Sequence, residues 1–285
     1  MASPPNEPSR GKQVRVIVHS FFIVPGLIAV FYVLIQALIG LAVGSPPSSK
    51  EALNTIARGS ERERWQAARV LAGMLQSGRG VTVDQEFLDQ MIFEYRRAGS
   101  ERTPFLRFYL TLAMGLTRDP RFEPALLEGL ADDDRANQLA AIHALGLAGG
   151  DAAVAALTPL LDDPDPTTVH RSVIALGWLG QNQVVPALQP LLGHPEPNVR
   201  WEAAIALAQL GDRSGVETIN ALLDRNYYGQ FPGVEPSEQD WAIQMAVEVA
   251  SRLKDPRFKE NLVRLSRNDP NLRVVNAALI ALKQY

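Results

Sequence analysis

Hydrophobic residues return along most of the chain at a fixed interval of 31 residues. Met114, Leu145, Leu176 and Leu207 are separated by that interval, and each is followed by a glycine or an alanine. Around each of them, apolar residues keep the three- and four-residue spacing of one helical face. Self-similarity of this length is typical of repeat architectures, in which each unit packs on the next.

A second apolar series predicts another helix in each repeat. Its members, again 31 residues apart, are Leu126, Leu157, Leu188 and Ile219. Prolines mark the link between the two helices at matching places, Pro164 and Pro166 in one repeat and Pro195 and Pro197 in the next. Since proline is tolerated in the first turn of a helix but disrupts its middle, the repeating unit is helix, turn, helix.

Two irregular gaps fit the same plan. Leu71 precedes Met114 by 43 residues, and Leu253 follows Leu210 by 43 residues, which is one period plus 12 in each case. Seven periods with two insertions of 12 residues account for residues 45–285. The sequence therefore predicts an all-α solenoid of seven helix pairs over this range.

The repeats resemble a known family. VRWEAAIALAQLGD at 199–212 and VHRSVIALGWLG at 169–180 are similar to the HEAT repeat, and the short period looks most like its phycobilisome-lyase type. This resemblance implies a superhelix in which the second helix of each pair lines the concave side. It also implies a function in binding other proteins.

The amino-terminal region predicts a membrane anchor. Residues 1–12 are polar and rich in proline, which favours a disordered tail. No charged residue occurs between Val16 and Ser49, and about 20 apolar residues suffice to cross a bilayer. We predict a transmembrane helix over 13–44 that contacts lipid through 16–43. A cleaved signal peptide is the alternative, although the apolar run is longer than a usual signal segment.

Small and polar residues within this span predict an intramembrane contact, at Gly26, Ala29, Gln36 and Gly40. The alternative is a lipid-facing helix with incidental glycines. Three basic residues precede the span (Arg10, Lys12 and Arg15) and three follow it within about 20 residues (Lys50, Arg58 and Arg62), and the closer clustering of the first three favours a cytoplasmic amino terminus. The predicted localisation is thus a single-pass membrane protein with an extracytoplasmic solenoid.

Charge and composition argue against several functions. Residues 45–285 contain 25 Lys and Arg against 30 Asp and Glu, and this mild acidity disfavours nucleic acid as a partner. The chain has no cysteine, which removes disulfides and thiol catalysis. None of its four histidines adjoins a glutamate, as in the HEAT-repeat hydroxylases that bind iron. The aspartates at 132–134 and 162–163 stand where they would cap the following helix. We predict no catalytic residue, cofactor or metal site.

One face of the second helices is unexpectedly apolar. Positions four residues apart carry bulky side chains in the middle repeats, namely Phe108, Leu112 and Leu116, Leu139, His143 and Leu147, His170, Ile174 and Trp178, and Trp201, Ile205 and Gln209. An apolar surface of this extent, with tryptophan, is typical of a docking site. We predict that Phe108, Leu112, His143, Leu147, Ile174, Trp178, Trp201 and Ile205 form a groove that binds an apolar or amphipathic segment. Packing between neighbouring helices is the alternative.

Two further segments are candidates for contact. The second insertion, 226–238, displays Tyr227, Tyr228 and Phe231 among glycines and prolines, and we predict partner binding there. The last helix is apolar on almost all sides, which is a possible surface for self-association.

The sequence thus favours a non-enzymatic scaffold, anchored in the membrane, that docks a segment of a membrane protein complex. Two alternatives stay open. One is a lyase-type accessory that acts on a bound pigment or lipid, and the other is a receptor for soluble peptides.

Overall fold

The computed structural model describes residues 48–78 and 80–285, and in this part of the chain all regular structure is helical. Fourteen α-helices form seven consecutive pairs. The pairs are α3 (Ser49–Arg58) with α4 (Glu61–Gln76), α5 (Gln85–Ser100) with α6 (Pro104–Thr117), α7 (Glu123–Glu128) with α8 (Arg135–Ala148), α9 (Asp151–Leu157) with α10 (Pro166–Leu179), α11 (Val185–Leu188) with α12 (Pro197–Gln209), α13 (Val216–Leu222) with α14 (Pro236–Leu253), and α15 (Lys259–Asn268) with α16 (Leu272–Leu282).

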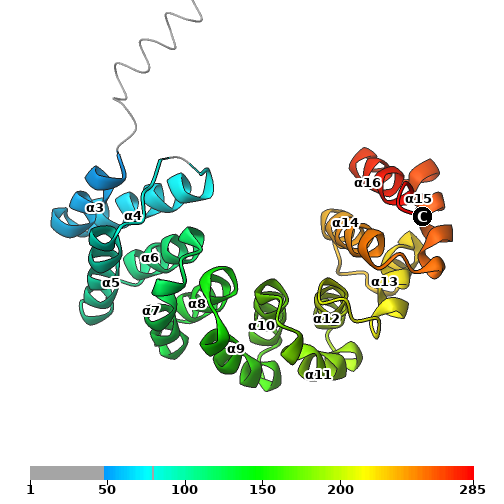
Figure 1. The fold of residues 1–285 in the computed structure, drawn as a ribbon, viewed down its shortest axis with the longest axis horizontal. Helices are drawn as coiled ribbons and strands as arrows, with labels where there is room; N and C mark the ends of the chain where they lie inside the picture. The colour runs from blue at the N-terminus through cyan, green and yellow to red at the C-terminus, as the bar shows by residue number, and fades with distance from the viewer. Residues whose placement is uncertain (1–47, 79) are drawn as a thin grey trace, which may run out of the picture. The chain divides into compact units, whose positions relative to one another are not determined.

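Residues 49–285 form one compact unit in which the pairs follow an arc (Figure 1). The even-numbered helices from α4 to α16 lie along the inner side of the arc, and the odd-numbered helices lie along its outer side. This arrangement confirms the predicted all-α solenoid of seven helix pairs.

The structure overturns the predicted single-pass membrane localisation. None of the helices in residues 48–78 and 80–285 is long and apolar enough to cross a bilayer. The longest of these helices, α14, has 18 residues and contains four charged residues, whereas apolar helices such as α12, with 13 residues, are too short to cross. The predicted span over 13–44, the lipid contact through 16–43 and the stripe Gly26, Ala29, Gln36 and Gly40 lie outside the described residues.

Several outer helices are shorter than a 31-residue repeat suggests. α7, α9 and α11 each continue as a 3-10 segment, η3 (Gly129–Ala131), η4 (Thr158–Asp162) and η6 (Gln189–Gly193). Pro159 and Pro190 fall at the start of two of these segments, where they remove α-helical hydrogen bonds. The repeat leucines Leu126, Leu157 and Leu188 are nevertheless fully buried against the inner helices.

Glycine sets the distance between the inner helices in the middle of the arc. A Cβ atom added to Gly115 would lie 2.7 Å from the Cα of Ala144, and one added to Gly146 would lie 2.7 Å from the Cα of Ala175. Gly177 approaches Ala206 in the same way, at 3.0 Å from its Cβ. These three glycines, which follow Met114, Leu145 and Leu176, therefore let consecutive inner helices touch along their backbones.

The two insertions lie where the longer gaps predict them. The first covers the turn after α4 and the extended α5. The second forms the 3-10 segment η7 (Arg225–Gln230) and the turn before α14. Arg225 holds this segment in place by pairing with Asp240 of α14 and with Asp269, 2.7 Å away at the end of α15.

Buried apolar side chains form two clusters that divide at α12. One cluster runs from α3 to α12, and the other runs from α12 to α16. Val199 and Leu207 belong to the first cluster, whereas Trp201 and Ile205 belong to the second. α12 is therefore packed on both sides, and eight consecutive residues, 201–208, are buried.

Candidate partner-binding groove

The inner wall of the arc is apolar in its middle. Phe108 and Leu112 of α6, Leu147 of α8 and Ile174 of α10 are half-buried there. Trp178, at the end of α10, has 45% of its surface exposed and lies close to Gly146 of α8. These side chains are partly covered by neighbouring helices and partly open to solvent, as a docking surface requires.

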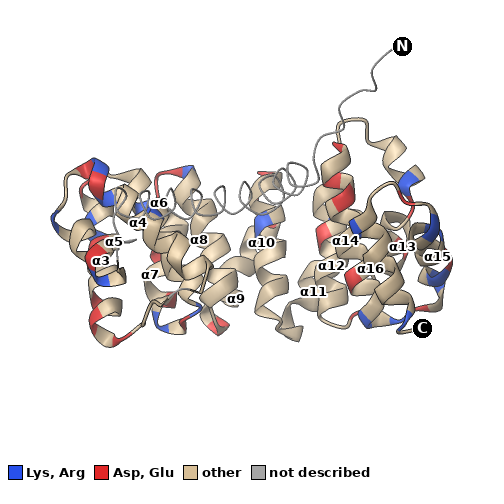
Figure 2. Ribbon diagram, turned by 90° about the horizontal axis from the view of Figure 1, so that it is seen from above, with Lys and Arg blue, Asp and Glu red and all other residues tan. Residues whose placement is uncertain are grey.

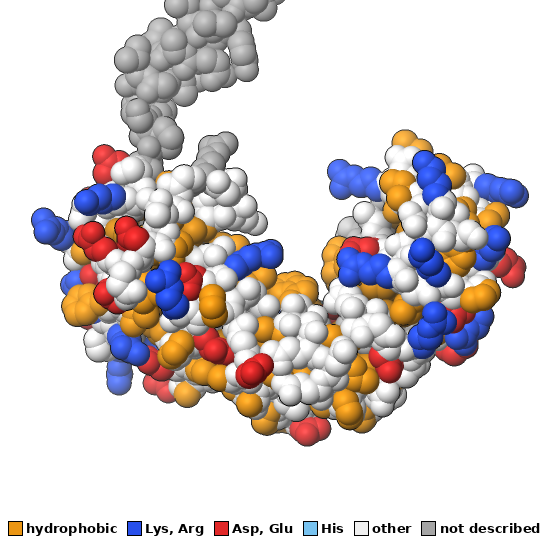
Figure 3. Space-filling view, in the orientation of Figure 1, with side chains coloured by type: hydrophobic (Ala, Val, Ile, Leu, Met, Phe, Trp, Pro, Cys, Tyr) orange, Lys and Arg blue, Asp and Glu red, His pale blue; other side chains and the backbone are white. Residues whose placement is uncertain are grey.

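Charged residues concentrate on the two arms of the arc. Figure 2 shows many Lys, Arg, Asp and Glu residues on α3–α5 and on α13–α16 and fewer on α8 to α12. Hydrophobic side chains are visible inside the arc in Figure 3. A partner that enters the middle of the arc would meet an apolar wall.

Trp201 and Ile205 lie deeper than the other predicted groove residues. Only 5% of Trp201 and 1% of Ile205 is exposed. The ring of Trp201 meets Phe231 at 5.2 Å between centroids and Tyr228 at 5.6 Å, and its Nε1–H donates a hydrogen bond to the Tyr227 hydroxyl at 3.2 Å. The aromatic residues of the second insertion thus cover Trp201 from within the chain.

This covering changes what the insertion offers to a partner. Tyr228 is buried and donates a hydrogen bond from its hydroxyl to the Leu222 carbonyl oxygen. Tyr227 and Phe231 are half-buried, with only part of each ring accessible. Partner contact through these three residues stays a prediction, limited to the exposed parts of Tyr227 and Phe231.

The two histidines on the wall are neutral near pH 7. His143 packs edge-on against Trp178, with 5.1 Å between the ring centroids. Burial lowers the pKa of His143 and of His170, and the charge of Arg171 lowers both further. Neither imidazole therefore brings a positive charge to the groove.

A cavity of about 280 Å³ opens at the α12–α14 end of the wall. It is lined by His170 of α10, Asn198, Trp201, Glu202 and Ile205 of α12, and Ser237, Glu238, Trp241 and Ala242 of α14. Glu202 is 7% exposed, and Trp241 is 51% exposed. We call this cavity the Glu202 pocket.

The sequence analysis missed both Glu202 and Trp241. One signal was available for Glu202, since the helix around it is apolar on every side. Within 201–208 every residue except Glu202 is apolar, and a charged residue in such a segment is expected to be buried. Trp241 gave no comparable signal, because its exposure depends on how α14 follows the insertion.

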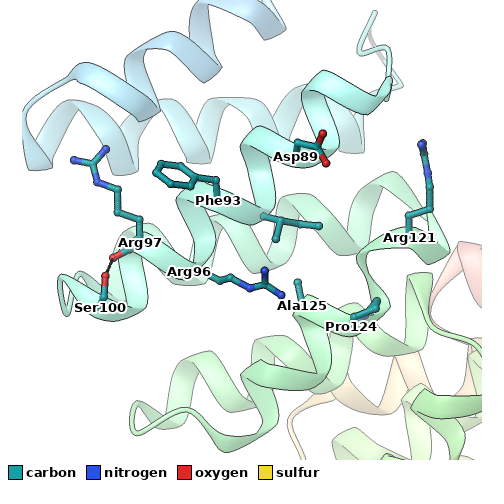
Figure 4. Close-up of a pocket in the computed structure, with 9 residues that line it drawn as sticks. Asp89, Phe93, Arg96, Arg97, Ser100, Arg121, Pro124 and Ala125 are labelled. Carbon is teal, nitrogen blue, oxygen red and sulfur yellow. Dashed lines mark hydrogen bonds between the residues drawn. The ribbon is translucent and has the colours of Figure 1, made fainter.

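A larger hollow, of about 760 Å³, lies between α5 and the segment that begins α7 (Figure 4). It combines the exposed Phe93 with three arginines. Each guanidinium already has a carboxylate partner, Arg96 with Glu128, Arg97 with Glu101 and Arg121 with Asp119. This hollow therefore offers no free cation for an anionic ligand.

The aspartates at the turns act as helix caps. Asp134 accepts a hydrogen bond from the backbone N–H of Asn137, at the start of α8. Asp165 does the same for Thr167 at the start of α10. In residues 48–78 and 80–285, no group of three or more His, Asp or Glu residues could hold a metal ion.

The last helix keeps an uncovered apolar face. Leu272, Leu279 and Ile280 of α16 are all exposed. Self-association through this helix stays a prediction.

The sequence has no match among curated proteins. Its fold resembles the complex of CpcE and CpcF of phycocyanin lyase from Nostoc sp. PCC7120, with a TM-score of 0.58 and 20% identity over 84% of this chain and 88% of that one. It is also similar to YibA of Escherichia coli, with a TM-score of 0.49 and 16% identity over 87% of this chain and 85% of that one. At these identities the likeness shows the fold alone.

The family comparison agrees with the repeat spacing. Residues 101–177 and 157–228 match the family model for HEAT repeats. These ranges contain the helices α6 to α12 that line the middle of the inner wall. Residues 101–228 therefore carry HEAT repeats, within an all-helical solenoid.

Proposed function

We propose that the HEAT-repeat unit is a protein-interaction scaffold whose inner wall binds an amphipathic segment of a partner protein. The observation that carries this proposal is the exposure of Trp178 at the centre of an inner wall with few charges. Tryptophan is the residue most often found at the energetic centre of protein interfaces. Half-buried neighbours on α6, α8 and α10 extend the apolar surface around it.

The shape of the wall favours an elongated ligand. Its side chains recur at matching positions of successive inner helices, from Leu112 through His143 to Ile174, so they form a row across several helices. A helix or extended peptide with apolar residues on one side can contact such a row at several points. The polar side of the ligand would remain in water.

A selection experiment tests this function. The purified full-length chain is presented to a display library of random amphipathic peptides, and the enriched peptides are synthesised and measured by fluorescence anisotropy. We expect Trp178→Asp to weaken their binding by roughly tenfold or more, since the loss of a central aromatic contact costs more than about 1.4 kcal/mol.

Phe93→Asp is the matched control. Phe93 is an aromatic residue on the outer helix α5 with 63% of its surface exposed, outside the inner wall. It should leave peptide binding unchanged. A library that yields no binder, or equal effects of the two substitutions, would overturn the proposal.

A further inference from the structure

The Glu202 pocket holds a buried carboxylate that has no partner in the described part of the chain. Four acidic residues are buried in the described part of the chain: Glu94, Asp132, Glu202 and Asp255. Three of them pair with arginine, Glu94 with Arg64, Asp132 with Arg107 and Asp255 with Arg257. Glu202 forms neither a salt bridge nor a hydrogen bond within residues 48–78 and 80–285.

Burying an unpaired carboxylate is unfavourable, because the ion loses its hydration without compensation. The loss of hydration raises the pKa of Glu202 to about 7. The side chain is therefore close to half ionised at neutral pH, and a positive charge beside it would complete the ionisation. At Glu94, Asp132 and Asp255, an arginine of the chain supplies this positive charge.

No group of the chain that lines the pocket can supply this charge. His170 is the one basic residue in the lining, and burial lowers its pKa. The other titratable residue in the lining, Glu238, is acidic and cannot supply a positive charge. Its carboxylate accepts a hydrogen bond from the Glu235 N–H as part of the cap of α14. In the described part of the chain, no group beside Glu202 supplies a positive charge, so a bound partner is left to supply it.

The remaining lining suits an organic cation better than a metal ion. Trp241 is exposed at the rim, and Trp201 forms part of the wall. Tryptophan faces attract Lys ammonium and Arg guanidinium groups, which also bring an aliphatic stem that packs on apolar surface. The pocket offers a single free carboxylate in an apolar setting, which is too few oxygen ligands for a hard cation.

We infer that the Glu202 pocket binds one lysine or arginine side chain of the segment that lies in the groove. This inference rests on the proposed function, and it adds the chemistry of the partner: an amphipathic segment with a basic residue near one end of its apolar face. The pocket lies beside α10 and α12, so it continues the wall that contains Ile174 and Trp178.

The test repeats the peptide selection on the wild-type chain and on Glu202→Gln. Peptides selected by the wild type should carry Lys or Arg at a fixed distance from their apolar residues. Peptides selected by Glu202→Gln should keep the apolar pattern and lose that basic position. Glutamine has the same shape without the charge, so the variant is expected to fold.

A double-mutant cycle then tests whether Glu202 and the basic residue of the peptide interact. At pH 8, Glu202→Gln and replacement of the peptide's basic residue by norleucine should each weaken binding roughly tenfold, and the two changes together should weaken it little further. Glu248→Gln is the control, because Glu248 is an exposed residue of α14 that pairs with Arg252. It should change the affinity less than about twofold.

Carbon-13 NMR of the glutamate carboxyl groups gives an independent reading on the unmodified chain. The pKa of Glu202 should fall by about one unit or more when the peptide binds, since an adjacent positive charge favours the ionised form. Apolar peptides without a fixed basic residue, or an unchanged pKa, would overturn the inference and leave the groove intact. A library that yields no binder overturns the groove together with this inference.

Discussion

The junctions between α6 and α12 differ from the junction between α12 and α14 in what lies between the helices. From α6 to α12, Gly115, Gly146 and Gly177 each bring the next inner helix into backbone contact. At the fourth position of this series the glycine is replaced by Ala208, and the following repeat carries the second insertion. An aromatic cluster and the Glu202 pocket occupy that junction.

This difference shows how the regularity of the sequence determines the kind of junction between neighbouring inner helices. Where the 31-residue interval is kept, identical contacts recur and the helices form an even wall. Where the interval is broken, side chains that belong to no repeat position must fill the space. The irregular junction is therefore where a recognition pocket could arise without disturbing the regular ones.

The largest expected effect concerns the cost of burying Glu202. Its pKa is about 7 in the folded chain against an ordinary value of 4.5, so the folded chain binds more protons between these pH values. The free energy of unfolding should then fall as pH rises from about 4.5 to 7. Glu202→Gln should remove this loss, worth about 3 kcal/mol at pH 8, since one pH unit corresponds to about 1.4 kcal/mol.

The measurement is urea unfolding of the wild type and the variant at pH 5 and pH 8. Histidines away from the pocket contribute equally to both proteins and cancel in the difference, whereas the titration of His170, which lines the pocket, is followed separately by NMR. Glu248→Gln serves as the exposed control, with an expected effect below about 0.5 kcal/mol. Equal pH dependence in the wild type and Glu202→Gln would show that the pocket carboxylate is better solvated than its burial indicates.

The next effect tests the regular junctions. Gly146→Ala should lower the free energy of unfolding by roughly 2 kcal/mol, because the added methyl overlaps Ala175 and presses on Trp178. Gly73→Ala is the matched control, since nothing lies within 4 Å of its added Cβ. That change should raise stability by about 0.5–1 kcal/mol through helix propensity. Thermal unfolding followed by circular dichroism distinguishes the two variants. A stabilising effect of Gly146→Ala would contradict the close approach of α8 and α10 at this glycine.

The smallest effect tests the aromatic cluster at the irregular junction. Tyr227→Phe keeps the ring and removes the hydroxyl that accepts the Trp201 Nε1–H. We expect a loss of about 1 kcal/mol, the usual net contribution of such a hydrogen bond. A blue shift of the Trp201 fluorescence would accompany it. No change in either quantity would indicate that the insertion does not hold Trp201 in solution.

The sequence predicts the architecture of the solenoid well, because spacing reports packing directly. The interval between Met114 and Leu207 identifies the inner helices, and the two gaps of 43 residues locate both insertions. Pro159 and Pro190 are compatible with an interruption of the outer helices, but they do not indicate that these helices continue as 3-10 segments.

The site is predicted less completely, since exposure depends on tertiary contacts. Trp178 and Trp201 belong to the same predicted face of the inner helices, yet Trp178 faces solvent and Trp201 is covered by Tyr227, Tyr228 and Phe231. No pattern in the insertion reveals that it folds back on its own repeat. Glu202 is missed for the same reason, because its pocket forms only when α10, α12 and α14 come together.

The glycine contacts of the inner row have a consequence for the length of the molecule. Gly115, Gly146 and Gly177 each meet an alanine 29 positions further along, so the three joints are chemically the same. Removing the 31 residues from 146 to 176 would place Gly177 directly after Leu145, so that Gly115 would still meet Ala144 and Gly177 would still meet Ala206, while an added copy would create one more joint of the same kind. The span between the two arms could thus be shortened or lengthened by whole units without redesigning a single contact surface.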